Sequence, residues 1–154
     1  MGFIIMDKIK NNNKKIMIFA EGTILKPKRN NFFSRINLNT YVPIKNAREI
    51  IKSWQEIGYE IIYITSRKGN NAMKMAILLD ELSFVGSMVG YRQKGQSYAT
   101  LIKEEQPDIL IEDNCKSIGG EKHMCINQLD EELKKKIKSI VVNEFEGIDD
   151  VKLY

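Results

Sequence analysis

Polar and acidic side chains follow three apolar runs of this sequence, at the point where each run ends. These polar segments are Glu21-Gly22-Thr23, Thr65-Ser66-Arg67 and Glu112-Asp113. Short apolar, β-branched runs predict buried strands. Parallel strands bring their carboxyl ends to one edge of a sheet, where open α/β folds bind ligands. We therefore expect Glu21, Thr65, Glu112 and Asp113 to converge on one crevice, where carboxylates can act as nucleophiles, bases or cation ligands.

The order of these segments resembles the haloacid dehalogenase-like superfamily, whose members are mostly magnesium-dependent phosphatases. The family's first motif is a strand followed by Asp-x-Asp-Gly-Thr, and its second is a strand ending in Thr or Ser. Its third motif is a Lys, and its fourth is a strand ending in paired acids. The counterparts here are Phe19-Ala20-Glu21-Gly22-Thr23, Thr65, Lys94 and Glu112-Asp113. The resemblance covers about residues 15 to 145 and implies a Rossmann-like fold.

The first motif departs from the family at two positions. The nucleophilic Asp, which also binds the metal in the family, is replaced by Phe19, and the acid/base Asp is replaced by Glu21. A phenyl ring offers neither a nucleophile nor the hard oxygen that Mg²⁺ requires. A slip of one residue would place Ala20 at the nucleophile position, and that register supplies no carboxylate either.

The resemblance implies a role for each matched residue. Glu21, Thr65 and Lys94 are the expected catalytic groups, with Lys94 neutralising charge on a phosphoryl group. The expected substrate-binding residues are Gly22, Thr23, Ser66 and Arg67. The expected ligands of a Mg²⁺ cofactor are Glu21, Glu112 and Asp113, with Asp113 as the direct oxygen donor.

Alternating strand and helix patterns predict the elements that position these residues. Apolar residues at helical spacing predict a helix from Ala47 to Ile57, with Asn46 as its N-cap and Gly58 at its end. Further helices are expected over 71–82, 96–105 and 129–137, and further strands over 84–89 and 139–142. The fold class is α/β, a three-layer Rossmann-like domain with a mainly parallel sheet of about five strands and helices on both faces.

We expect the chain to consist of three parts, a flexible lead-in over 1–14, an α/β domain over 15–145 and a C-terminal tail over 146–154. The connection between Thr23 and Asn46 is about twenty residues, too short for the separate cap domain of many superfamily members. By resemblance, capless members act on macromolecular phosphates or rely on a partner to close the site. A phosphorylated substrate or ligand, either a small molecule or a macromolecule, is therefore the expected partner, and the oligomeric state is left open.

A basic and aromatic segment, residues 26–35, has two interpretations. Lys26-Pro-Lys-Arg29 followed by Phe32-Phe33 and Arg35 combines cations and rings that can bind a nucleic acid backbone and stack a base. The alternative is a solvated loop whose two Phe residues pack back onto the domain, and we favour it because the run is short.

Composition limits the class of protein. The chain has 154 residues, 43% of them hydrophobic, a net charge of +4 and a pI of about 9.0, which fits one globular domain with a substantial core. No apolar stretch approaches a membrane span, so a cytoplasmic protein without membrane contact is expected. Cys115 and Cys125 form no metal-binding spacing and are expected to be reduced thiols.

Three functions are compatible with these features. The first is a magnesium-dependent phosphatase-type hydrolase in which Glu21 replaces the missing carboxylate as nucleophile or as base for a water molecule. The second is a catalytically inactive protein that keeps a crevice for a phosphate-bearing ligand or partner. The third is a nucleic-acid-binding module that uses residues 26–35.

Overall fold

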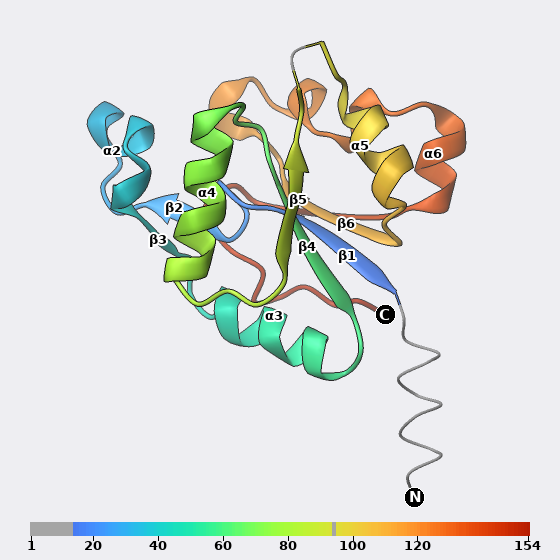
Figure 1. Cartoon of the computed structure of the whole chain (residues 1–154), viewed down its shortest axis with the longest axis horizontal. Helices are drawn as coiled ribbons and strands as arrows, with labels where there is room; N and C mark the ends of the chain where they lie inside the picture. Colours follow the sequence, from blue (N-terminus) through green and yellow to red (C-terminus); the bar gives the residue numbers. More distant parts are fainter. Residues whose placement is uncertain (1–13, 94) are drawn as a thin grey trace, which may run out of the picture.

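A five-stranded parallel sheet forms the centre of the computed structural model, which describes residues 14–93 and 95–154 (Figure 1). The strand order is β5-β4-β1-β6-β7, and every neighbouring pair is parallel. The strands of this sheet are β1 (Lys15–Phe19), β4 (Glu60–Thr65), β5 (Ser87–Tyr91), β6 (Ile109–Asp113) and β7 (Lys138–Val142). This arrangement is the predicted Rossmann-like α/β fold.

Helices cover both faces of the sheet and make three layers (Figure 1). The α-helices are α2 (Phe32–Ile36), α3 (Ala47–Glu56), α4 (Asn70–Glu81), α5 (Tyr98–Glu105) and α6 (Glu131–Lys136). The short 3₁₀ helices are η1 (Leu38–Thr40), η2 (Lys116–Ile118), η3 (Glu121–His123) and η4 (Ile126–Gln128). Buried side chains of α3 and α4 belong to the core on one face, and those of α5 belong to the core on the other.

The alternation of side chains along β1 explains why both faces need cover. Ile16 and Ile18 join the core beneath α3 and α4, whereas Met17 joins the core beneath α5, and each is at most 1% exposed. The chain runs from β1 through β4 to β5 on one side, then crosses to β6 on the other side of β1. Such a reversal leaves a crevice at the carboxyl ends of the strands.

The connection between Thr23 and Asn46 folds as a small projecting unit, here called the arm (residues 25–43). Its base is an antiparallel pair, β2 (Leu25–Pro27) and β3 (Tyr41–Pro43), and α2 and η1 form its outer part. Asn31 caps α2 because its side chain accepts a hydrogen bond from the Ser34 N–H at 2.8 Å. Figure 1 shows α2 standing to one side of the sheet.

Several boundaries and burial states differ from the predicted ones. β5 begins at Ser87 rather than near Phe84, which is buried just before the strand. β7 is a half-exposed edge strand and not a buried one, since one side of it has no neighbouring strand. Asn46 lies at the start of α3 but does not cap it, because its side chain donates instead to Asp149 at 2.8 Å.

The C-terminal segment packs on the domain. Within the predicted tail, Ile148 is 0% exposed and Leu153 is 7% exposed, and both belong to the core beneath α3 and α4. The predicted lead-in, residues 1–14, lies outside the described residues except for Lys14. Among the described residues, no helix combines the length and the apolar character needed to cross a bilayer.

Replacing Ile148 by Ala tests whether the tail contributes to the core. Removing a fully buried aliphatic side chain leaves a cavity, so the free energy of unfolding should fall by about 2–5 kcal/mol in urea denaturation. Ile77→Ala is the matched control, because Ile77 is 56% exposed on α4 and its truncation should change stability by less than about 0.5 kcal/mol. Equal effects of the two substitutions would show that the tail is not part of the core.

Candidate functional site

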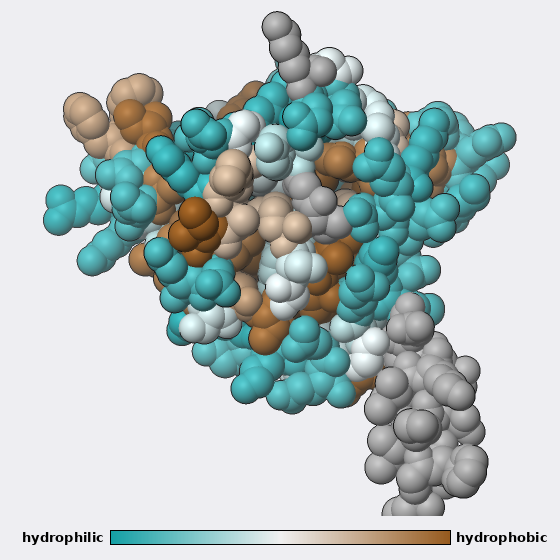
Figure 2. All heavy atoms as spheres, viewed as in Figure 1, coloured by the Kyte–Doolittle hydropathy of each residue, from teal (hydrophilic) through white to brown (hydrophobic). Residues whose placement is uncertain are grey.

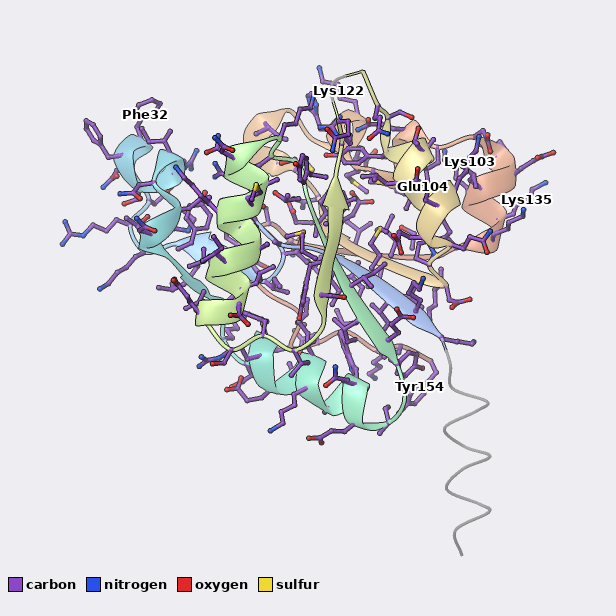
Figure 3. The ribbon with its side chains drawn as sticks, viewed as in Figure 1. Phe32, Lys103, Glu104, Lys122, Lys135 and Tyr154 are labelled. Carbon is purple, nitrogen blue, oxygen red and sulfur yellow. The ribbon has the colours of Figure 1, made fainter. Side chains whose placement is uncertain are left out.

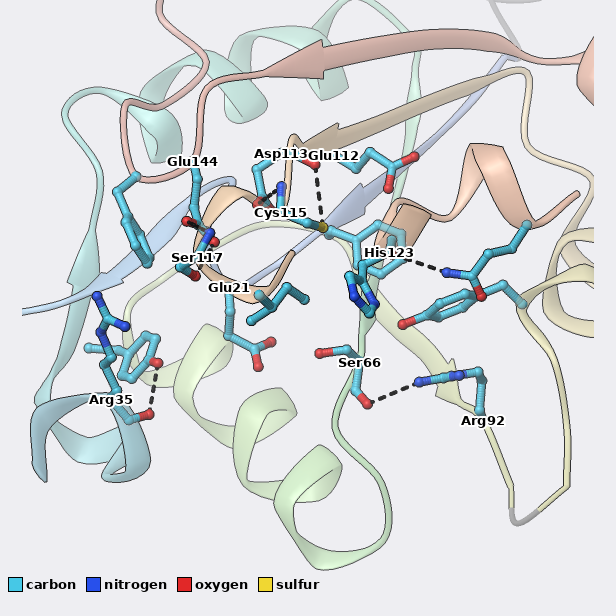
Figure 4. Close-up of a pocket in the computed structure, with 17 residues that line it drawn as sticks. Glu21, Arg35, Ser66, Arg92, Glu112, Asp113, Cys115, Ser117, His123 and Glu144 are labelled. Carbon is cyan, nitrogen blue, oxygen red and sulfur yellow. Dashed lines mark hydrogen bonds between the residues drawn. The ribbon is translucent and has the colours of Figure 1, made fainter. Parts of the chain in front are cut away.

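A cavity of about 430 Å³ opens at the carboxyl ends of β1, β4 and β6, at the crevice that the strand order creates (Figure 4). Three of the predicted acids, Glu21, Glu112 and Asp113, line it. Thr65 does not line it but hydrogen-bonds Glu21. The structure thus brings together the residues that the sequence places at three strand ends.

The Glu21 carboxylate is held by two partners. Thr65 donates its hydroxyl to one oxygen at 2.7 Å, and the Nε of Arg67 donates to the other at 2.6 Å. The Thr65 hydroxyl in turn accepts the backbone N–H of Arg67 at 3.1 Å. Arg67, predicted to bind substrate, therefore pairs with a predicted catalytic carboxylate, and the pair is largely shielded, with the two side chains 21% and 17% exposed.

Asp113 joins the first and fourth motifs directly. One of its oxygens accepts the Thr23 hydroxyl at 3.1 Å, and the other accepts the backbone N–H of Cys115 at 3.0 Å. Gly22 lies so close that an added Cβ would sit 2.7 Å from Asp113 Oδ1, and its φ of 83° also requires glycine. Burial raises the pKa of the Asp113 carboxyl, although the hydrogen bonds from Cys115 and Thr23 oppose this shift. Gly22 and Thr23, both predicted to bind substrate, thus form the supporting contacts of Asp113.

Glu112 points away from the other two acids. Its carboxylate accepts the backbone N–H groups of Cys125 at 2.6 Å and Ile126 at 3.0 Å, and the residue is 3% exposed. Burial raises the pKa of Glu112 to about 7, and these two hydrogen bonds oppose the shift without cancelling it. Glu112 therefore ties the loop that carries η2, η3 and η4 to the end of β6.

Phe19, which the resemblance aligns with the family's nucleophile, lines the cavity wall. Its ring packs edge to face on Tyr98, with centroids 5.4 Å apart. Ala20 is 0% exposed in the core. The wall at this point is thus formed by two aromatic rings, and residue 19 contributes no carboxylate to it.

The acids do not form a site that fits a magnesium ion. Mg²⁺ needs several oxygen ligands in near-octahedral geometry. Among residues 14–93 and 95–154, no three Asp, Glu, His or Cys side chains are grouped closely enough to hold a metal. Each of the three predicted ligands is instead held by donors of the protein. Glu21 is held by Thr65 and Arg67, Glu112 by the N–H groups of the opposite loop, and Asp113 by Thr23 and Cys115.

The cysteines near the cavity do not supply a nucleophile in place of Phe19. Cys115 lines the cavity and Cys125 is buried, and neither forms a disulfide. Burial, reinforced by the charges of Asp113 and Glu112, raises the pKa of the Cys115 thiol to about 12. Because the thiolate is the reactive form, this thiol is a poor nucleophile at neutral pH.

Two arginines that were given no site role in the prediction also line the cavity. Arg92 lies after β5 with its guanidinium 4.0 Å above the Tyr98 ring, and its Nη2 donates to the Ser66 carbonyl at 3.5 Å. The Arg92 Nε is buried and has no hydrogen-bond partner among the described residues. Arg35 comes from the arm, and Figure 4 shows it across the cavity from Arg92. Lys94, the predicted third motif, lies outside the described residues.

The sequence pattern does not distinguish these two arginines as cavity residues. Arg92 lies in the Gly90–Gly95 segment, two positions before Lys94. Arg35 belongs to the basic and aromatic segment 26–35, but nothing in that pattern indicates that the segment reaches the cavity. His123, the one histidine of the sequence, also lines the cavity.

Comparison with known proteins identifies the same fold. A family model described as PITM 1-3, LNS2 domain, a lipin/Smp2-like phosphatase fold of the haloacid dehalogenase-like superfamily, matches residues 30–117, more than half of the chain. The match begins after Thr23, so it does not include the altered first motif. A search of curated proteins by sequence gives no match.

Solved structures also share this architecture. A chain of the Pnkp1/Rnl/Hen1 RNA repair complex aligns with 87% of the protein at 14% identity and a TM-score of 0.62, and the protein spans 43% of that chain. The class C acid phosphatase from Bacillus anthracis aligns with 95% at 14% identity and a TM-score of 0.54, covering 75% of that enzyme. The same enzyme with tungstate bound gives 15% identity and a TM-score of 0.52. At identities this low, these structures show a shared fold and leave the chemistry to the site.

The raised pKa of Glu112 predicts how stability changes with pH. The folded state holds a proton up to about pH 7, whereas the unfolded chain loses it near pH 4.5. The Glu112 contribution is therefore fully present below pH 4.5, and the free energy of unfolding should decline between pH 4.5 and 7, by at most about 3 kcal/mol.

Urea denaturation at pH 5 and pH 8, with the native protein and Glu112→Gln, measures this contribution. Asp113 shifts in the same direction and remains in both proteins, so the difference between them isolates Glu112. The variant should lose less stability than the native protein between the two pH values. An identical decline in both would show that Glu112 ionises normally.

Proposed function

The chain belongs to the LNS2 domain family, and on that premise we propose that it binds a phosphate-bearing ligand in the cavity without hydrolysing it. The observation that carries this proposal is the state of the first motif. Phe19 provides no nucleophile, and the nearest carboxylate, Glu21, is already held by Thr65 and Arg67. Covalent phosphoryl transfer needs a free carboxylate at this place.

The charges around the cavity support an anionic ligand. Arg35 and Arg92 both line it, and the unpartnered Nε of Arg92 is a donor without an acceptor. Four acids also line the cavity, and each is directed to protein donors or partly neutralised. Glu21 is paired with Arg67, and burial favours the protonated form of Glu112 near pH 7. Asp113 accepts hydrogen bonds from Thr23 and Cys115, and Glu144 accepts them from Ser117. Arginine suits this role since its planar guanidinium binds phosphate oxygens in pairs.

A hydrolase with an altered site is the second candidate, supported by the position of Glu21 in the cavity wall. Glu21 would attack the phosphoryl group or activate a water molecule, Thr65 would hold the phosphoryl group, and Lys94 would stabilise its charge. For this to happen the Glu21 carboxylate must first leave Arg67, with which it forms a 2.6 Å ion pair. This requirement makes the non-hydrolytic function the better supported one.

Hydrolysis of 4-nitrophenyl phosphate in the presence of Mg²⁺ separates the two candidates. The native protein should release nitrophenol no faster than its Glu21→Gln variant, because neither has a free carboxylate at the first motif. Phe19→Asp restores the carboxylate beside Asp113, and turnover in this variant alone would indicate a phosphatase scaffold that lost its nucleophile. Native turnover that Glu21→Gln abolishes would overturn the proposal in favour of the hydrolase.

Calorimetric titration with phenyl phosphate, without Mg²⁺, tests binding separately from turnover. Arg92→Gln should weaken binding roughly tenfold or more, because it removes a charge-assisted contact. Arg48→Gln is the matched control, since Arg48 also donates to a backbone carbonyl, that of Leu82 at 3.0 Å, but lies away from the cavity lining. Equal affinities in the two variants, or no binding by the native protein, would contradict the proposed site.

A further inference from the structure

The tip of the arm exposes three large apolar side chains. Phe32, Phe33 and Ile36 of α2 are 71%, 77% and 57% exposed, and the two rings meet edge to face with centroids 6.0 Å apart. Figure 3 shows Phe32 pointing away from the body, and Figure 2 shows brown and tan side chains gathered at the same end of the molecule. The interpretation in which these rings pack back onto the domain is therefore wrong, and the exposed rings need another explanation.

The charges around the tip are all of one sign. Residues 24–43 contain four cations and no Asp or Glu. Lys26, Lys28, Arg29 and Arg35 are exposed. A surface that combines exposed rings with cations alone is complementary to a polyanion that carries flat aromatic groups.

The arm is continuous with the cavity. Arg35 and Tyr41, from α2 and β3, line the cavity. The backbone carbonyl of Arg35 accepts hydrogen bonds from the Tyr41 hydroxyl at 2.9 Å and from Arg67 Nη2 at 3.4 Å. A ligand that entered the cavity with a phosphate group could therefore extend along the arm to Phe32 and Phe33.

The lining of the cavity distinguishes between two phosphate-bearing partners, a nucleic acid and a membrane surface. Four of its residues present Phe or Tyr rings, namely Phe19, Tyr41, Tyr98 and Phe145. Ile118 is the one aliphatic side chain among the described residues that line the cavity. Rings stack on bases, whereas the acyl chains of a lipid need aliphatic surface, so the lining favours a nucleic acid over a membrane surface.

We propose that the arm and the cavity together bind a single-stranded nucleic acid, with bases on Phe32 and Phe33, the backbone along the four cations and a terminal phosphate in the cavity. The stacking and backbone contacts of the arm do not depend on the proposed function. The placement of the terminal phosphate in the cavity rests on it. Stacking tolerates any base and electrostatic contacts follow the backbone, so the surface is expected to show little preference for sequence.

Fluorescence anisotropy with a labelled 12-nucleotide single strand tests the stacking contacts. Phe32→Ala/Phe33→Ala should weaken binding at least about fivefold, because each stacked base contributes about 1–3 kcal/mol. Tyr154→Ala is the matched control, an aromatic ring 94% exposed at a distant part of the surface, and should bind as the native protein does (Figure 3). No loss in the arm variant would overturn the proposal.

The salt dependence tests the cations. If the four cations contact phosphates, raising the salt from 50 to 200 mM should weaken native binding roughly fiftyfold. Lys28→Ala/Arg29→Ala should reduce the slope of log affinity against log salt by about 1.4. Lys134→Ala/Lys135→Ala removes two cations of α6, away from the arm, and should leave the slope unchanged. A slope that does not differ between these variants would contradict a backbone path along the arm.

Strands with and without a terminal phosphate separate this inference from the proposed function. The phosphorylated strand should bind about tenfold more tightly, and Arg92→Gln should abolish that difference. If phenyl phosphate binds but neither strand does, the inference fails while the proposed function stands. If both strands bind equally, the placement of a terminal phosphate in the cavity is wrong. Sedimentation with phosphatidylserine and phosphatidylcholine vesicles that depends on Phe32 and Phe33, without strand binding, would identify a membrane surface instead.

Discussion

Three carboxylates share one shielded edge of a parallel sheet, and each of them must be satisfied by donors from the protein. A buried charge without partners costs several kcal/mol, so the surrounding chain is arranged to supply them. Glu21 takes Thr65 and Arg67, Asp113 takes Thr23 and a backbone N–H, and Glu112 takes two backbone N–H groups. In a related fold that binds a cation, the cation would supply much of this compensation. Here protein hydrogen bonds and proton uptake by Glu112 supply it.

The same contacts define which side of the cavity is open to a ligand. The acids are directed toward their protein partners. Arg35 and Arg92 lie on opposite sides of the space, where Arg35 donates to Asn30 at 2.7 Å and Arg92 donates to the Ser66 carbonyl at 3.5 Å (Figure 4). Arg35 belongs to the arm, whose Leu25, Leu38 and Tyr41 are buried in the core, and Arg92 follows β5. Ligand recognition at the cavity therefore depends on the position of the arm. The Arg35 carbonyl of the arm accepts hydrogen bonds from Tyr41 and from Arg67, and the same Arg67 forms the ion pair with Glu21.

The sequence was sufficient for the architecture and for the convergence of the motifs. Apolar periodicity predicted the helix that begins at Ala47, and the order of the motifs brought Glu21, Thr65 and Asp113 to one edge. What it could not supply was the direction of each side chain. Glu112 and Asp113 are neighbours in a strand and point to opposite faces, so Glu112 accepts hydrogen bonds from Cys125 and Ile126 whereas Asp113 accepts one from Thr23. The burial of Ile148 and the exposure of Phe32 depend on contacts between distant segments, which local patterns do not encode.

The central position of β1 also governs how the chain can fold. Ile16 pairs with Ile61 on one side and with Ile109 on the other, roughly ninety positions later in the chain. The pairing with β6 closes a long loop before any stabilising contact offsets the lost entropy, which makes folding slow for a domain of this size. During synthesis, one side of the Ile16-Met17-Ile18 segment stays unpaired until β6 has emerged from the ribosome. The carboxyl ends of β1 and β6, which border the site, therefore come together late. The nascent chain is most prone to aggregate before β1 and β6 have paired.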